Sequence, residues 1–162
     1  MPDTLYRTTS GLANQHLFFG VDLVVYSEGG SEWGSLEEAI RGGSDETPDA
    51  AYWRAVFTAC RPEFTIHIKS VGSRRVAGEI ARLAEAGGIG SVYVCTDADL
   101  DWINPEPAVP LNQIRSWGYS WESDLADIDI LNCVFLRLRG NSVRAQQVMA
   151  ELATWYGTFI GS

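Results

Sequence analysis

Residues 91–101 read Ser-Val-Tyr-Val-Cys-Thr-Asp-Ala-Asp-Leu-Asp, and this stretch decides the fold that we expect. Its first half is apolar and rich in β-branched side chains, which predicts a buried strand over 91–96. Its second half places three carboxylates, Asp97, Asp99 and Asp101, directly after that strand. The chain therefore passes from a core strand straight into an acidic segment.

Two similar strands are expected upstream, over 20–27 and 64–69. A helix is predicted to begin at Thr47-Pro48, because a capping hydroxyl followed by proline is typical of a helix start. A second helix, with Val76 and Ile80 at helical spacing, precedes the strand at 91–96. Strands that alternate with helices in this way predict a parallel sheet covered on both faces.

Downstream of the acidic segment the pattern is weaker. We expect a short helix over 111–115, a short fourth strand over 118–122, and a mostly helical end over 126–162. The whole chain, 1–162, is short enough for a single domain. The sequence thus predicts an α/β fold with a core at about 18–125: a mostly parallel sheet of about four strands, helices on both faces, and C-terminal helices.

Composition indicates a folded domain that does not attract nucleic acid by its overall charge. The net charge is −9, from 21 acidic and 12 basic residues, so a phosphate backbone is repelled unless metal ions, a local basic patch or a basic partner offset the charge. The three cysteines are scattered and form no C-x-x-C motif. This pattern indicates a protein of the reducing cytoplasm, and it argues against a zinc site built on cysteine thiolates. No stretch is long and apolar enough to suggest a membrane partner.

The acidic segment is a candidate metal site. Glu28 follows the first strand as Asp97 follows a later one, and the carboxyl ends of parallel strands meet at one edge of a sheet, where chemistry collects. Mg²⁺ and Mn²⁺ prefer such oxygen ligands. An EF-hand is excluded, since its glycine and bidentate glutamate would fall on Trp102 and Ala108. A solvated acidic turn and the D-x-D of sugar transferases remain alternatives, and Glu28 could instead cap a turn.

Other residues could complete a site. Glu122 is either a further acid of the site or a helix-start acid. Lys69, Arg74 and Arg75 could form a phosphate clamp at a strand end and a helix start, or could be solvated surface charges. Tryptophans in loops, Trp117 among them, could stack on a base or pack in a core or interface.

These motifs resemble the Toprim fold of topoisomerases, primases and OLD-type nucleases. The likeness is greatest to an uncharacterised Toprim-like family encoded beside ABC-type ATPases in bacterial anti-phage systems. It covers about residues 18–125 and rests on five motifs: Glu28-Gly29, Asp49 with Tyr52-Trp53, Ser73-Arg74-Arg75, Asp97-Ala98-Asp99 with Asp101, and Tyr119-Ser120-Trp121-Glu122. The acidic, glycine-rich stretch 30–48 resembles an insertion, and the chain ends sooner than expected for the family.

The resemblance implies a metal-dependent nuclease that acts on DNA or RNA, as the effector subunit of an ATPase-associated defence system. By the same resemblance Asp97 and Asp99 hold Mg²⁺ or Mn²⁺, Glu28 is a ligand or the general acid/base, and Asp101 and Glu122 complete the metal shell. The implied partners are nucleic acid and an ABC-type ATPase subunit, and a homodimer is left open. Two alternatives are a catalytically degenerate module that binds a partner, and a phosphotransfer or sugar-transfer enzyme that uses the D-x-D.

Overall fold

The computed structural model describes residues 9–33, 35–99, 101, 103 and 109–125, together with positions 147, 150 and 154. The expected C-terminal helical part, 126–162, lies outside the described residues except at these three positions. The elements in chain order are α1 (Thr9–Ala13), α2 (Gln15–Phe19), β1 (Leu23–Ser27), α3 (Leu36–Gly42), α4 (Pro48–Cys60), β2 (Ile66–Ser70), α5 (Arg74–Ala86), β3 (Val92–Thr96), β4 (Gln113–Arg115) and α6 (Trp121–Leu125).

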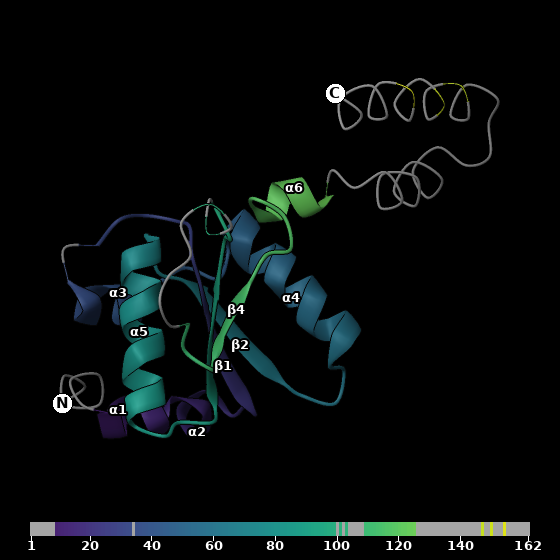
Figure 1. Ribbon diagram of the computed structural model, residues 1–162. Helices are drawn as coiled ribbons and strands as arrows, with labels where there is room; N and C mark the ends of the chain where they lie inside the picture. The colour runs from purple at the N-terminus through teal and green to yellow at the C-terminus, as the bar shows by residue number, and fades with distance from the viewer. Residues whose placement is uncertain are drawn as a thin grey trace.

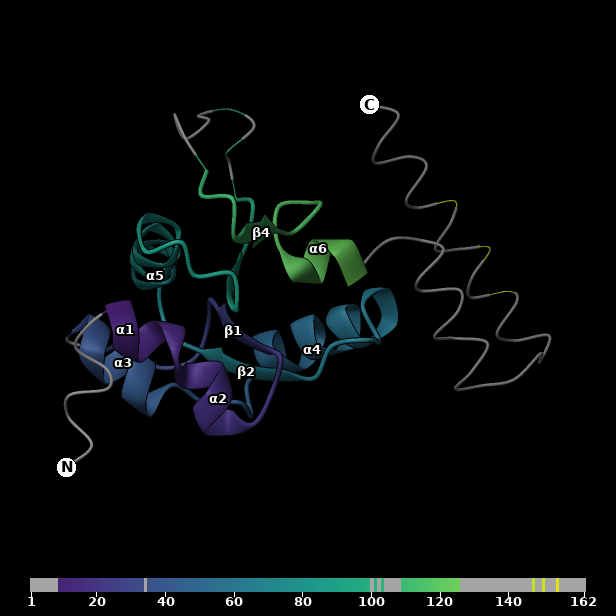
Figure 2. The same cartoon turned by 90° about the horizontal axis from the view of Figure 1, so that it is seen from below.

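The four strands form one sheet in the order β2-β1-β3-β4, and every neighbouring pair is parallel. Helices cover both faces, with α5, α3 and α1 on one side and α4 on the other (Figures 1 and 2). The predicted α/β fold with a parallel sheet of four strands is therefore confirmed.

Alternation along β1 divides the core into two layers. Val24 and Tyr26 face α5 and its neighbours, whereas Val25 faces α4 together with Trp53 and Phe57. All three β1 side chains are fully buried. Burial on both faces explains why the strand reads as a continuous apolar run in the sequence.

The helix starts follow their local signals. Thr47 caps α4, since its hydroxyl accepts a hydrogen bond from the N–H of Ala50 (3.1 Å), and Pro48 is the first helical residue, as expected. The Thr47 hydroxyl also bonds to that of Ser70 at the end of β2. Ser70 in turn bonds to Ser27 at the end of β1 (2.8 Å), so the start of α4 is tied to the carboxyl edge of the sheet.

The fourth strand lies elsewhere than predicted. The expected helix over 111–115 is wrong, because Gln113–Arg115 forms β4 along β3. The expected strand over 118–122 is also wrong, because α6 begins at Trp121. Three strand residues are too few to show an alternating pattern, and pairing with β3 decides their conformation.

Among the described helices, none has the length and apolar character needed to cross a membrane.

Candidate metal centre

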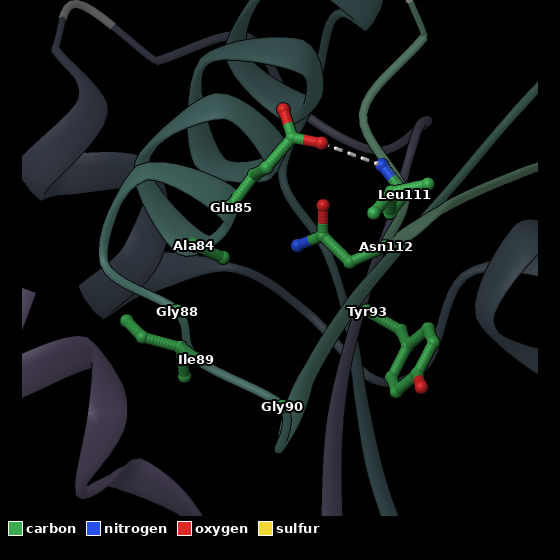
Figure 3. Close-up of a pocket in the computed structure, with 8 residues that line it drawn as sticks. All are labelled: Ala84, Glu85, Gly88, Ile89, Gly90, Tyr93, Leu111 and Asn112. Atoms are coloured by element: carbon green, nitrogen blue, oxygen red, sulfur yellow. Dashed lines mark hydrogen bonds between the residues drawn. The ribbon is translucent and has the colours of Figure 1, made fainter.

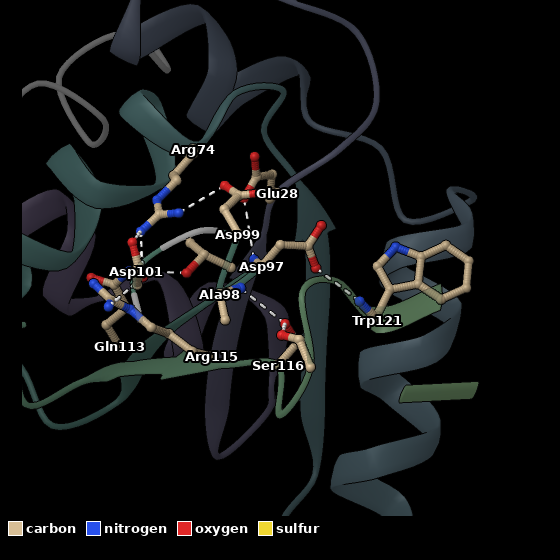
Figure 4. A network of polar contacts seen from close by, with 12 residues as sticks. Glu28, Arg74, Asp97, Ala98, Asp99, Asp101, Gln113, Arg115, Ser116 and Trp121 are labelled. Atoms are coloured by element: carbon tan, nitrogen blue, oxygen red, sulfur yellow. Dashed lines mark hydrogen bonds and ion pairs between the residues drawn. The ribbon is translucent and has the colours of Figure 1, made fainter. Parts of the chain in front are cut away.

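Glu28 and Asp97 lie side by side because β1 and β3 are adjacent and end at the same level. Ser27 is in register with Cys95, and the N–H of Glu28 donates to the carbonyl oxygen of Cys95 (3.0 Å). The Glu28 side chain reaches over β3, where its Oε2 accepts a hydrogen bond from the N–H of Asp97 (3.3 Å; Figure 4). We call Glu28 and Asp97 the strand-end carboxylates.

Trp121 connects Asp97 to a third acid, Asp49. The Trp121 N–H at the start of α6 donates to Asp97 Oδ1 (3.0 Å), and its indole Nε1 donates to Asp49 Oδ1 (3.1 Å). Gly29 lets Asp49 come close to β1, since a Cβ at residue 29 would lie 2.3 Å from Asp49 Oδ2. The φ angle of Gly29, +97°, is also one that side chains disfavour.

Burial and mutual repulsion raise the pKa values of these acids. Burial raises the pKa of Glu28, and the charges of Asp97 and Asp99 add to this effect, against the hydrogen bond from Asp97 and the charge of Arg74. Burial likewise raises the pKa of Asp97, with Glu122, Asp49 and Asp99 adding to it and the Trp121 N–H opposing it. Burial also raises the pKa of Asp49. The folded protein thus disfavours negative charge here, and a cation would relieve it.

Asp99 and Asp101 have a different environment, and we call them the arginine-bound carboxylates. Arg74, the first residue of α5, donates to Asp99 Oδ2 (2.7 Å) and to both oxygens of Asp101 (2.6 Å each). Arg115 of β4 lies 2.5 Å from Asp101 Oδ2. Burial disfavours the charge of Arg74, but its bonds to Asp101 and Asp99 outweigh this and raise its pKa.

The three basic residues of the predicted phosphate clamp do not converge. Arg74 binds the two aspartates, whereas Arg75 is exposed and pairs with Glu79 of its own helix (2.7 Å). Lys69 Nζ donates to the carbonyl oxygens of Ile40 and Arg41 at the end of α3 (3.0 and 3.2 Å). Burial lowers the pKa of Lys69. The three residues therefore bind different parts of the protein and do not form one clamp.

An ordered loop between β4 and α6 borders the strand-end carboxylates. The N–H of Ala98 donates to Ser116 Oγ (2.9 Å), and the N–H groups of Trp117 and Gly118 donate to Asp124 (3.0 and 2.5 Å). The Trp117 side chain is 98% exposed. Glu122, also exposed, lies one residue beyond Trp121, near enough to influence the charge of Asp97.

The described residues fit a divalent cation in part. The strand-end carboxylates carry unfavourable negative charge, which suits a cation, but the oxygens of Asp99 and Asp101 are held by arginines. Within the described part of the chain, no three acidic, histidine or cysteine side chains are close enough together to hold a metal ion in common. As the side chains are placed, Glu28 and Asp97 are the pair that could bind one, with Asp49 and Glu122 nearby.

A cavity of about 270 Å³ lies at the opposite end of the sheet, between the end of α5 and the starts of β3 and β4 (Figure 3). Ala84, Ile89 and Leu111 give it apolar walls, and Glu85 at its rim accepts a hydrogen bond from the N–H of Leu111 (3.0 Å). No sequence-predicted site residue lines it. We therefore place the candidate site at the carboxyl edge, where the acids collect, and not in this cavity.

Sequence reasoning missed the partners that orient the acids. The sequence marks Asp49 only as a motif residue at a helix start, and nothing in it indicates that Asp49 is a neighbour of Asp97. Arg115 gave no signal, because its segment was expected to be helical. Trp121 contributes its backbone N–H as well as its ring, a role that no side-chain motif reveals.

Comparison with known proteins gives no match: no protein-family model, no curated protein and no solved structure is significantly similar to this chain.

Proposed function

We propose that this chain is a Toprim-like, metal-dependent nuclease that hydrolyses phosphodiester bonds of DNA or RNA with Mg²⁺ or Mn²⁺. One observation carries the proposal: Glu28 and Asp97 lie together at the ends of adjacent parallel strands, with pKa values raised by burial and by neighbouring acids. Two neighbouring carboxylates whose negative charge the fold offsets only in part are suited to a divalent cation.

The chemistry divides between the cation and the chain. A bound divalent ion neutralises a phosphate and lowers the pKa of a coordinated water. Asp97 would bind the ion, and the hydrogen bond from the Trp121 N–H would orient its carboxylate. Glu28 would be either a second ligand or the general acid/base, because its raised pKa suits proton transfer nearer to neutral pH. Asp99 would join them only after release from Arg74.

Contacts to nucleic acid would come from the loop beside the strand-end carboxylates. Trp117 is almost fully exposed and Tyr119 is 54% exposed, and aromatic rings in such positions can stack on bases. Arg75 is exposed, follows Arg74 at the start of α5 and pairs with Glu79, and it would add a phosphate contact. The net charge of −9 still opposes binding, which favours action together with a partner, such as the ABC-type ATPase that the resemblance implies.

The test is manganese-dependent cleavage of labelled single-stranded and duplex oligonucleotides by the purified chain, with and without nucleotide-bound ATPase partner. We expect cleavage that Asp97→Ala abolishes and that Glu63→Ala retains, since Glu63 is an exposed acid that precedes β2, at the other end of the sheet. Normal metal-dependent cleavage by Asp97→Ala would remove Asp97 from the mechanism.

A second candidate is a non-catalytic module that keeps the fold and binds a partner. The ion pairs that occupy Asp99, Asp101 and Arg74 favour it, because they stabilise the loop without any metal. Calorimetric titration of Mg²⁺ and Mn²⁺ separates the candidates. Saturable binding that Asp97→Ala loses supports the nuclease, and no binding at millimolar metal makes the partner-binding module the better proposal.

A further inference from the structure

Arg74 lies where one side chain can reach two acids of the same segment. It begins α5 directly after the turn at Gly72, whose φ is +89°. Its guanidinium contacts Asp99 through one nitrogen and Asp101 through the other (Figure 4). The Arg74 and Asp101 side chains are only 23% and 18% exposed. Charge-assisted bonds of this length and burial are among the stronger ones in proteins.

The backbone of Asp99 is held in a conformation that supports this contact. Asp99 has φ +47°, the one positive φ among the described residues other than glycine. Its N–H donates to the carbonyl oxygen of Tyr119 (2.7 Å), so the loop before α6 fixes it from the opposite side. A strained position of this kind persists only where several contacts determine it together. The bond to Arg74 is one of those contacts.

The strand-end carboxylates lack such a partner. Within the described residues, neither Glu28 nor Asp97 forms an ion pair, and each accepts a hydrogen bond only from a backbone N–H. Two kinds of carboxylate thus occupy neighbouring positions. Asp99 pairs with Arg74 and Asp101 with Arg74 and Arg115, whereas Glu28 and Asp97 have no arginine partner among the described residues.

We propose that Arg74 is a resident cation that reserves Asp99 and, together with Arg115, Asp101, so that a divalent ion binds only at Glu28 and Asp97. A neutral side chain at residue 74 then makes Asp99 available to an additional divalent ion, beside Asp101, which Arg115 still holds. The first part rests on the metal site of the proposed function, whereas the second part can be tested without it. Arg74 is in this sense a positioning residue, which sets the number of ions and not the chemistry.

The experiment is calorimetric titration of Mn²⁺ into the whole chain and into Arg74→Met and Arg74→Gln. We expect one ion per wild-type chain and two per variant chain, or, where the second ion is weak, an affinity raised by about tenfold or more because a competing charge has gone. Arg82→Met is the matched control: Arg82 is an exposed arginine of the same helix and should leave binding unchanged.

Thermal unfolding gives a second readout that needs no activity. Without metal, the Tm of Arg74→Met should fall by roughly 3 °C, since Asp99 then loses its arginine partner and Asp101 keeps only Arg115. Millimolar Mn²⁺ should restore it, because a ligand of the folded state raises its stability. Arg74→Gln keeps hydrogen-bond donors for the aspartates, so it carries the test if Arg74→Met does not fold.

The outcomes separate this inference from the proposed function. If the variants match the wild type in ion number, affinity and response of Tm to Mn²⁺, Arg74 reserves nothing and the inference is wrong. If the wild type binds no Mn²⁺ but the variants bind one ion, the Glu28–Asp97 site fails while the role of Arg74 stands. If wild type and variants all bind no Mn²⁺, both fail.

Discussion

Asp97 and Asp101 are four residues apart in an alternating acidic run, yet the fold treats them in opposite ways. The arginine-bound carboxylates receive positive charge from Arg74 and Arg115, at distances of 2.5–2.7 Å. The strand-end carboxylates receive backbone N–H groups only, and their pKa values rise. The same residue type therefore stabilises the fold at Asp101 and stores unfavourable charge at Asp97. Three substitutions and one pH series test this comparison.

The largest effect is expected at the backbone next to the strand-end carboxylates. Gly29→Ala should lower the free energy of unfolding by about 2–3 kcal/mol, because it adds a strained φ and pushes Asp49 from its bond with Trp121. Gly20→Ala is the control: its φ is +65° but nothing lies within 4 Å of the added Cβ, so about 1 kcal/mol is expected. Urea unfolding measures both, and equal losses would contradict the close approach of Asp49.

Asp101→Asn tests the arginine-bound carboxylates. We expect a loss of about 1–2 kcal/mol in the free energy of unfolding, because two mostly buried arginines lose their shared charged acceptor. Glu63→Gln removes an exposed pair with Arg61 and should leave the free energy of unfolding almost unchanged. Urea unfolding at pH 7 in the presence of a chelator measures the difference. A loss at Asp101 no larger than that at Glu63 would show that these ion pairs contribute little.

Asp97→Asn should raise the free energy of unfolding, whereas the two changes above lower it. The asparagine oxygen can still accept the Trp121 N–H, while the cost of burying a charge and the repulsion from Glu122, Asp49 and Asp99 disappear. Without metal at pH 7 we expect stability to rise by a few tenths of a kcal/mol, a small gain because the site is partly exposed to solvent. Chemical unfolding of both proteins in parallel checks the sign. A clear loss would mean that the Asp97 charge is already compensated in the folded protein.

The smallest expected effect is a change with pH in the stability difference between Asp97→Asn and wild type. A carboxyl with a raised pKa in the folded state binds its proton more tightly there, so it favours folding at low pH and loses this contribution as pH rises through the folded-state pKa. Protonated Asp97 resembles asparagine. The stability gap between Asp97→Asn and wild type should therefore shrink as pH falls from 7 towards about 4. A gap that is constant over this range would exclude a raised pKa at Asp97.

Much of the fold could be predicted from the sequence because its signals are local. The expected strands at 20–27, 64–69 and 91–96 correspond to β1, β2 and β3, and the helix start at Thr47-Pro48 is where it was expected. β4 was missed, since three residues carry too little pattern and their conformation depends on pairing with β3.

For the candidate site, the sequence was sufficient to predict that Glu28 and Asp97 lie close together. Both follow strands of one parallel sheet, and parallel strands end at a common edge. Sequence did not distinguish Asp97 from Asp99 and Asp101, because all three alternate in one acidic run. That the acids form a metal centre of a nuclease stays a prediction, which the titrations above would test.

The sequence by itself determined the α/β class, the buried strands and the edge at which the acids collect. These follow from hydrophobic patterning and from capping residues, which act over a few neighbouring positions. Only the tertiary structure decided which acids keep an unfavourable charge. Arg74 is 25 residues from Asp99 in sequence, and Trp121 is 72 residues from Asp49, so their contacts depend on how helices and loops meet above the sheet. Electrostatic pairing acts through space, and the order of residues alone does not encode it.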